Sequence, residues 1–396
     1  MDTYCIRSFN WYLVDLDRLQ HKMCCLTKWK PMQPGEDWFN GPEMQARRQD
    51  HLEGRRHRDC DHCWKIEDKA QLSPRQLDPR PAKISQSLDP HRPALLEITM
   101  GNVCDLACRY CNADHSTIWS QRMGDSENSK QGRSSIKTDD RYQTVMPQFR
   151  AWLQSELDGL HSIWFTGGEV LLMDSFYDLV RTAKFKRKHI GISTNLNAND
   201  QYMQRIITLV QELVADGNDV LFRVSMDGVG LKNDWQRQYS SWDRMRKNWY
   251  TLGAIQGVTM GVGYTVTPLT FEGMLEVGDF VLASTPELSS APIWYPINTV
   301  RYPHELDAGD WVGAFAEDFS KLSELIKKNN FNITNDGVTA QLDDWSTRPY
   351  ALPSAEQAHK LVEWLDDSAA RWGGGDWRSI YPRVSEIADK AMANAK

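Results

Sequence analysis

From residue 94 onward, short apolar runs alternate with longer amphipathic runs, and this alternation constrains the fold more than any other feature. The short runs have the length of strands, and the longer runs repeat their apolar residues at helical spacing. Strands that alternate with helices typically form β/α units around a parallel sheet. The predicted strands are 94–100, 162–166, 190–194, 220–226, 258–265 and 294–300. The predicted helices are 144–158, 175–185, 201–215, 241–252 and 271–283.

About six β/α units fit this pattern, too few for a closed eight-stranded barrel. We therefore predict an α/β fold built as a partial (β/α)6 TIM-like barrel over residues 94–300. Residues 1–93 form a predicted Cys-rich module that ends in a Pro-rich linker, because repeated Pro disfavours regular structure. Residues 301–396 have mainly helical periodicity and are predicted to be a C-terminal extension. The polar segment 116–143 is predicted to be a long exposed loop.

The net charge of −7 does not favour a protein that binds polyanions through its overall charge. Two local basic runs are nevertheless present. Each fits either a solvated helix face or a patch that contacts phosphate groups. The runs consist of Arg47, Arg48, Arg55, Arg56 and Arg58, and of Lys184, Lys186, Arg187 and Lys188.

No stretch of the sequence approaches the length of about 18 apolar residues that a membrane span requires. The N-terminus also lacks the apolar core of a signal peptide. We therefore expect a cytoplasmic protein, in the host cytoplasm if it is encoded by a phage. In a reducing compartment, eight cysteines are more typical of metal ligands than of disulfides.

Three of the cysteines, Cys104, Cys108 and Cys111, follow the first predicted strand with the spacing C-x3-C-x2-C. Thiolates are the usual protein ligands of iron–sulfur clusters, and a loop after a strand lets three of them converge. Three ligands on a four-iron cube leave one iron open for a small molecule. A zinc site with His115 as a fourth ligand, or spare thiols, are the alternatives.

This spacing, with the aromatic Tyr110 before the third cysteine, resembles the signature of the radical SAM superfamily. The resemblance implies that the triplet holds a 4Fe-4S cluster whose open iron binds S-adenosylmethionine (SAM). One electron then cleaves SAM to a 5′-deoxyadenosyl radical, which abstracts a hydrogen from the substrate. An electron donor such as flavodoxin or ferredoxin is also implied.

Later segments, each after a predicted strand, resemble further motifs of that superfamily. The run 166–169 is similar to its G-G-E motif, although Val170 stands where proline is usual, and 225–228 is similar to its S-x-D-G motif. The resemblance covers residues 94–267. Arg223 fits either a partner of the SAM carboxylate or a structural ion pair. The cofactor contacts that the resemblance implies are Tyr110, Gly167, Gly168, Glu169, Ser193, Asn195 and Asp227.

The other five cysteines, Cys5, Cys24, Cys25, Cys60 and Cys63, all precede the predicted barrel. The last two form a C-x2-C pair, which is favourable metal-ligand spacing. The set resembles the SPASM/twitch modules of radical SAM proteins and implies a second 4Fe-4S cluster. A structural zinc site and buried thiols remain alternatives, and one of the adjacent pair Cys24 and Cys25 is left over.

The N-terminal cysteines and the chain length resemble phage-type twitch radical SAM proteins. This resemblance implies isomerisation of a glycyl-modified thymidine during phage DNA hypermodification, with modified DNA as the substrate. A radical SAM peptide maturase that cross-links or epimerises its substrate is the first alternative. A non-catalytic metal-binding protein is the second.

Overall fold

The computed structural model describes residues 3–69, 73–77, 92–122, 140–295, 298–300, 303–329, 332–333 and 337–394. The chain divides into two compact units. Unit 1 comprises Met1–Val103, Ser129–Ser193 and Leu209–Leu221, and unit 2 comprises Cys104–Asn128, Thr194–Thr208 and Phe222–Lys396. Three elements are divided between the units: β7 (His189–Thr194), α10 (Asp200–Ala215) and β8 (Asp219–Ser225).

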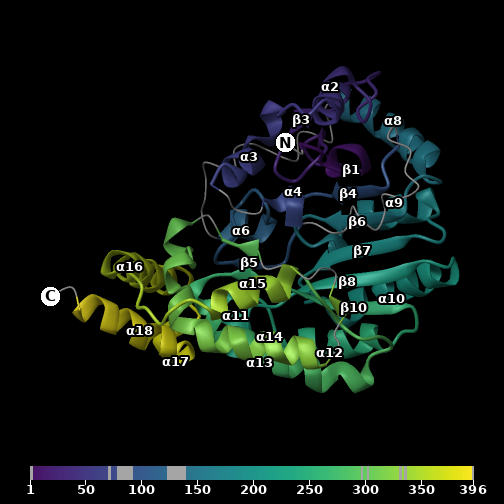
Figure 1. Cartoon of the computed structure of the whole chain (residues 1–396). Helices are drawn as coiled ribbons and strands as arrows, with labels where there is room; N and C mark the ends of the chain where they lie inside the picture. The colour runs from purple at the N-terminus through teal and green to yellow at the C-terminus, as the bar shows by residue number, and fades with distance from the viewer. Residues whose placement is uncertain are drawn as a thin grey trace. The chain divides into compact units, whose positions relative to one another are not determined.

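Unit 1 holds the first strands of the chain and the helices around them (Figure 1). Its strands are β1 (Trp11–Asp15), β2 (Gln20–Lys22), β3 (Lys30–Pro31), β4 (Leu95–Thr99) and β6 (Ser162–Thr166), followed by most of β7. Its helices are α1 (Arg7–Asn10), α2 (Pro42–Leu52), η1 (Arg58–Cys60), α3 (Asp61–Glu67), α4 (Pro74–Leu77), α8 (Asp140–Glu156), η4 (Val170–Leu172) and α9 (Asp174–Ala183).

The strands of unit 1 follow the order β3-β2-β1-β4-β6-β7, and Figure 1 shows β1, β4, β6 and β7 side by side. The pairs β1–β4, β4–β6 and β6–β7 are parallel, whereas β1–β2 and β2–β3 are antiparallel. The N-terminal segment therefore supplies a strand that continues the parallel series beyond β4.

Cross-strand apolar pairs form the core of this sheet. Ile163 of β6 lies opposite Leu96 of β4 and Ile190 of β7, and all three side chains are fully buried. On the other face of β6, a Cβ at Gly191 would meet the ring of Trp164 at 2.3 Å, so glycine is needed for the close approach. Successive side chains of a strand point to opposite faces, and in β6 the face of Ile163 and Phe165 is buried while the face of Trp164 is half-buried.

Unit 2 is richer in helices. Its helices are α6 (Thr117–Arg122), α11 (Leu231–Gln236), α12 (Trp242–Gly253), α13 (Pro268–Ser284), η5 (Thr285–Glu287), η6 (His304–Leu306), η7 (Gly309–Phe315), α14 (Ala316–Lys328), α15 (Gly337–Ser346), α16 (Ala355–Trp372), α17 (Trp377–Ile380) and α18 (Pro382–Ala393). Its short strands are β5 (Ala107–Cys108), β9 (Arg237–Gln238), β10 (Val258–Gly263), β11 (Thr265–Val266), β12 (Ile293–Trp294), β13 (Asn298–Thr299) and β14 (Asn332–Ile333).

Parallel pairing also dominates in unit 2, where the strand order is β8-β10-β12-β14 and β10–β12 and β12–β14 are parallel. The helix α13 begins at a capping box in which Thr267 and Thr270 bond each other's backbone amides. Its Phe271 ring packs against Phe319 of α14, with ring centroids 4.8 Å apart. Glu272 of the same helix accepts the backbone N–H of Val384 at the start of α18. The C-terminal helices are therefore packed onto the rest of this unit.

The prediction of an α/β fold with a mainly parallel sheet is confirmed, and the closure of the strands into a partial barrel stays a prediction. Four predicted strands correspond to β4, β6, β7 and β8 within a residue or two. The strand predicted at 258–265 is interrupted between β10 and β11. The strand predicted at 294–300 corresponds to β12 and β13.

The described ends of the segment 116–143, which is predicted to be a loop, are helical instead. Ser116 accepts the backbone N–H of Trp119, and the buried indole of Trp119 anchors the short helix α6. The rest of that segment, 123–139, and most of the predicted Pro-rich linker lie outside the described residues. The predicted division at residues 93 and 300 stays a prediction, while the compact units have the different bounds given above.

Candidate active site

The triplet Cys104, Cys108 and Cys111 lies on a loop of unit 2 that is held by backbone bonds. Strand β5 pairs antiparallel with β9, so that Cys108 lies opposite Arg237. The Cys111 amide donates to the Cys108 carbonyl oxygen over 2.8 Å, which closes a turn between two of the cysteines. The indole N–H of Trp119 donates to the same carbonyl oxygen, also over 2.8 Å. The loop is therefore fixed by the backbone and by a buried aromatic side chain.

Each thiol of the triplet has a polar neighbour within unit 2. The Cys104 sulfur is 3.9 Å from the side-chain nitrogen of Asn195, and the Cys108 sulfur is 3.8 Å from Nη1 of Arg237. The Cys111 thiol donates to the carbonyl oxygen of the next residue over 3.7 Å. Burial raises the pKa of the Cys108 thiol to about 12, although the charge of Arg237 acts in the opposite direction.

The donor chemistry of this loop fits an iron–sulfur cluster, because three thiols lie within eight residues and thiolates are the usual cluster ligands. Nevertheless, no group of three or more His, Cys, Asp or Glu side chains is close enough to hold a metal ion anywhere in the described ranges. The loop thus supplies the ligand types at fixed backbone positions, and cluster binding requires the thiol side chains to turn towards one another.

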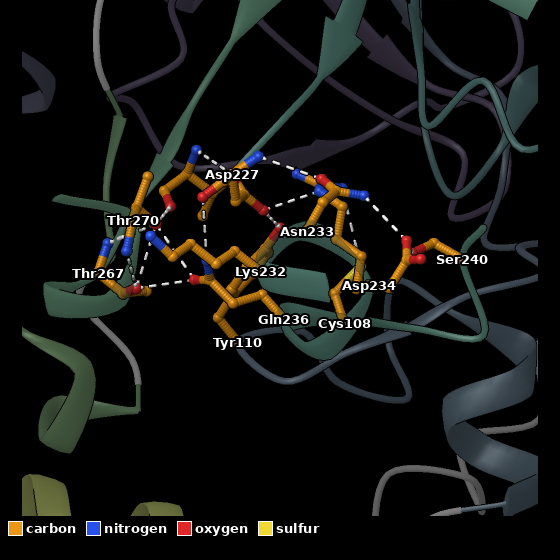
Figure 2. Close-up of polar contacts among 12 residues, drawn as sticks. Cys108, Tyr110, Asp227, Lys232, Asn233, Asp234, Gln236, Ser240, Thr267 and Thr270 are labelled. Carbon is orange, nitrogen blue, oxygen red and sulfur yellow. Dashed lines mark hydrogen bonds and ion pairs between the residues drawn. The ribbon is translucent and has the colours of Figure 1, made fainter. Parts of the chain in front are cut away.

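A buried ion pair between Asp227 and Arg237 lies next to the loop, since Arg237 also contacts Cys108. Figure 2 labels Asp227 among the polar contacts of this region, together with Cys108 and Tyr110. The carboxylate of Asp227 is fully buried and accepts the hydroxyl of Tyr110. It also pairs with Nε of Arg237 at 2.8 Å and accepts the amide of Thr265 at 3.0 Å. Burial raises the pKa of Tyr110 well above its usual value, so the hydroxyl keeps its proton and acts as a donor. Asp227 and Tyr110 are therefore engaged with each other in this structure.

A glutamine extends the same network to helix α13. The side-chain nitrogen of Gln236 donates to the Asp227 carbonyl oxygen at 3.1 Å. Its side-chain oxygen accepts the hydroxyls of Thr267 and Thr270, the two residues of the capping box, at 2.9 and 3.2 Å. Asn233 accepts the backbone N–H of Asp227. The S-x-D-G segment is thus anchored to the start of α13 through the side chain of Gln236.

A second set of contacts lies beside the first cysteine of the triplet. The Asn195 side chain donates to one oxygen of Asp105 at 2.8 Å, and Asn197 donates to the other at 3.1 Å. Asp105 follows Cys104 directly in the chain, so these amides hold the first turn of the loop. Asn195, a predicted cofactor contact, already has these partners.

The turn at Gly167-Gly168-Glu169 lies in unit 1 and packs on the segment that leads into Cys104. The Gly168 amide donates to the Gly101 carbonyl oxygen at 2.8 Å, and the Glu169 amide donates to that of Val103 at 2.6 Å. A Cβ at Gly168 would meet the Val103 carbonyl oxygen at 2.4 Å. Gly167 has a φ of 145°, which side chains rarely allow. Both glycines are therefore required by close backbone approach.

Glu169 itself is only 3% exposed, and its side chain accepts the amide of Leu171 at the start of η4. Ser193 is half-buried near the end of β7. The roles of these residues as cofactor contacts stay predictions.

Arg109, which lies between two cysteines of the triplet, is a residue whose importance the sequence does not reveal. It is 2% exposed, and its guanidinium donates to the carbonyl oxygens of Trp235, Ser368 and Gly373. It also lies 3.7 Å from the ring centroid of Trp235, in cation–π contact. The C-terminal extension therefore supports the cysteine loop directly, since two of the three acceptors belong to it.

Sequence reasoning also missed Arg237, Asp105 and Asn197, which contact the cysteines or their neighbours. None has a distinctive spacing. The one available signal is position: Asp105 lies inside the triplet, and Arg237 lies nine residues after the S-x-D-G segment.

The five N-terminal cysteines belong to unit 1, and four of them influence one another. Burial raises the pKa of Cys60 to about 12, and nearby Cys5, Cys24 and Cys63 act in the same direction. The adjacent Cys25 has an exposed side chain, and its sulfur lies 4.0 Å from Nη1 of Arg7. The thiol–thiol hydrogen bond of the adjacent pair lowers the pKa of Cys24 and raises that of Cys25. These positions favour Cys24 over Cys25 as the fourth member of the set.

A histidine lies beside this set. Nε2 of the buried His51 is 3.6 Å from the Cys60 sulfur, and its Nδ1 is 2.5 Å from the Thr3 carbonyl oxygen. Burial lowers the pKa of His51, which keeps the imidazole neutral. Its position is a property of the fold that no sequence spacing indicates.

The two basic runs differ in exposure. Arg47 and Arg48 are 1% and 5% exposed, with internal partners that include Asp59 and the Ser8 carbonyl oxygen. The interpretation of the whole first run as a solvated helix face, or as a phosphate-contacting patch, is therefore wrong for these two residues. In the second run, Lys184, Lys186 and Arg187 are exposed.

No model of a known protein family matches the chain, and no curated protein sequence matches it. Solved structures of SuiB from Streptococcus suis resemble it at low similarity. SuiB bound to S-adenosylmethionine is 16% identical over 61% of this chain and 46% of that chain, with a TM-score of 0.39. SuiB without a named ligand is 13% identical over 76% of this chain and 56% of that chain, with a TM-score of 0.41.

SuiB bound to its precursor peptide SuiA is 14% identical over 74% of this chain and 62% of that chain, with a TM-score of 0.38. The chain therefore spans about half to three-fifths of the length of the SuiB chains. Within the described residues, no helix is both long enough and apolar enough to cross a membrane.

Proposed function

We propose that this protein is a radical SAM enzyme in which Cys104, Cys108 and Cys111 hold a 4Fe-4S cluster. The observation that carries the proposal is the C-x3-C-x2-C loop, which is held by the β5–β9 pair and by the turn between Cys108 and Cys111. When bound, such a cluster supplies the electron that cleaves S-adenosylmethionine reductively. The protein then has to fix the loop, bind the cofactor and exclude water.

The chain's own residues divide these tasks. Arg109 and Trp119 fix the backbone of the cysteine loop from within the core of unit 2. Gly167 and Gly168 let the turn before Glu169 approach the backbone of 101–103, and we propose that this turn binds the amino group of the cofactor. Ser193 and Asn195 are proposed contacts of the ribose, since hydroxyl and amide groups suit sugar hydroxyls.

We assign Tyr110 and Asp227 a different role from the one that the resemblance implies. Because the two side chains bond each other in a fully buried network, we propose that they support the loop and do not contact the cofactor. The partial barrel, an electron donor such as flavodoxin or ferredoxin, and a second cluster in unit 1 remain parts of the proposal.

For the substrate we favour a peptide over modified DNA. Binding to DNA depends on cations that reach phosphate groups, and two of the five arginines in the first basic run are buried with internal partners. The net charge of −7 acts in the same direction. The alternative, isomerisation of a glycyl-modified thymidine in DNA, then requires DNA to bind through the exposed cations of the second run, Lys184, Lys186 and Arg187. The DNA proposal is restored if the protein binds duplex DNA in a salt-dependent way and charge reversal of Lys186 and Arg187 weakens that binding.

Anaerobic reconstitution with iron and sulfide, followed by dithionite and SAM, tests the central proposal. We expect the wild type to form 5′-deoxyadenosine, and the triple variant Cys104→Ala, Cys108→Ala, Cys111→Ala to form none. The matched control is Cys25→Ala, which removes an exposed thiol outside the triplet and should cleave SAM as the wild type does. Cleavage that persists in the triple variant contradicts the proposal, and so does a wild type that takes up no iron.

A further inference from the structure

Arg237 is a buried cation beside the sulfur of a proposed cluster ligand. Its side chain is 6% exposed, and its Nη1 lies 3.8 Å from the Cys108 sulfur. The β5–β9 pair places Arg237 and Cys108 opposite each other, so the contact depends on the backbone register as well as on a rotamer. A charge without solvent around it acts more strongly on its neighbours than an exposed one.

The counter-ion of Arg237 is Asp227, and its position orients the ion pair relative to Cys108. Asp227 carries the compensating charge at 2.8 Å, and its oxygens also bind the Tyr110 hydroxyl and the Thr265 amide. The contact with the sulfur of Cys108 is made by the guanidinium, while the carboxylate is occupied by these other donors. The pair is therefore neutral as a whole, with its positive end next to the cysteine.

We propose that Arg237 is a positioning residue that raises the reduction potential of the cluster held by the triplet, and that Asp227 and Tyr110 hold it in place. This proposal rests on the proposed function. Reduction adds negative charge to the cluster, and a fixed cation beside a ligand sulfur stabilises the reduced state. Net charge and hydrogen bonds to the sulfurs are among the factors that set cluster potentials.

A set of charge variants tests this, with the potential of the reconstituted cluster measured by anaerobic redox titration and EPR. Arg237→Gln removes the cation and leaves the buried carboxylate, so the potential should fall. We expect a change of about tenfold in the reduction equilibrium, or about 59 mV for a one-electron couple. Asp227→Asn leaves the cation uncompensated, and the potential should rise. Arg237→Lys keeps the charge and should stay close to the wild type.

Because Arg237→Gln leaves a buried carboxylate unpaired, it can fail to fold. The double variant Asp227→Asn, Arg237→Gln removes both charges and keeps polar side chains of similar size. Its potential should lie between those of the two single variants. Arg246→Gln, on the exposed side of α12, is the matched control and should keep the wild-type potential.

The outcomes separate this inference from the proposed function. A wild type that binds no cluster overturns the proposed function and this inference with it. Clusters that assemble in all variants with the same potential overturn this inference alone. The inference is supported if the potential is highest in Asp227→Asn, intermediate in the wild type and lowest in Arg237→Gln, while the iron content stays unchanged.

Discussion

At the scale of single residues, the burial of polar groups determines which side chains respond to pH. His21 of β2 is 5% exposed, and burial lowers its pKa to about 4, with the nearby Lys30 acting in the same direction. Its ring meets the ring of Tyr12 edge-on, with centroids 5.7 Å apart. The folded protein therefore holds a neutral imidazole in conditions where the unfolded chain already takes up a proton.

Between pH 7 and pH 5, the unfolded state binds a proton at His21 that the folded state does not bind. This residue should therefore lower the free energy of unfolding by about 2 kcal/mol over that range. Urea unfolding at both pH values measures the effect as the difference between wild type and His21→Gln, in which the loss should be smaller. His189→Gln, at an exposed histidine, is the control. An equal pH dependence in wild type and His21→Gln contradicts the prediction.

The residue scale is also where the sequence is least informative. The cysteine triplet and the glycines of the 167–169 turn are visible because their spacing or their residue type is unusual. Arg109 and Arg237 are not, because a buried arginine has no local pattern: its partners lie up to 264 positions away in the sequence. Arg47 and Arg48 illustrate the converse. Adjacent arginines near polar residues indicate a solvated surface, yet both of these side chains are buried.

At the scale of elements, the spacing of apolar residues predicts the strands and helices that bury one regular face. The strands at 162–166 and 190–194 have a buried face lined by Ile163, Phe165, Ile190 and Ile192, and they correspond closely to β6 and β7. The spacing of apolar residues does not predict elements that are fixed by a few tertiary contacts. The two-residue strands β5 and β9 are too short for a period, yet together they hold the cysteine loop.

Helix α16 is connected to the cysteine loop through Arg109, so this contact should contribute strongly to stability. Arg109→Met removes the donors to the carbonyl oxygens of Trp235, Ser368 and Gly373, and the contacts with the first two are buried. We expect a loss of about 2–4 kcal/mol in the free energy of unfolding, measured by urea titration followed through tryptophan fluorescence. Arg246→Met, whose side chain is 55% exposed, is the matched control and should keep the wild-type midpoint. Equal midpoints for Arg109→Met and wild type would show that the contact is dispensable.

At the scale of the whole molecule, the question is how many metal sites the two cysteine groups would form under the proposed function. The sequence separates two cysteine groups, and the structure assigns them to different compact units. The choice between a second cluster and zinc depends on electronic properties of the metal, which thiol spacing does not encode.

We expect about eight irons per chain in the reconstituted wild type, in line with two clusters of four. Replacing Cys60 and Cys63 with serine should halve the iron and leave the triplet able to cleave SAM. Elemental analysis of iron and zinc, together with the deoxyadenosine assay, measures both effects. Cys25→Ser is the matched control and should keep the full iron content, because Cys24 is the favoured ligand of the adjacent pair. Zinc in place of the second set of irons would assign the N-terminal cysteines a structural role.

The position of β1 between β2 and β4 has a consequence for how the chain folds. Its parallel pairing with β4 begins at Trp11 and Leu95, so the whole of 16–94 must be made before the pair can close. Pairs with such high contact order form slowly, and the apolar edge of β1 stays open in the meantime. All five N-terminal cysteines leave the ribosome before β4 does. A metal captured by those thiols during synthesis would therefore organise the nascent segment while its strand still lacks a partner.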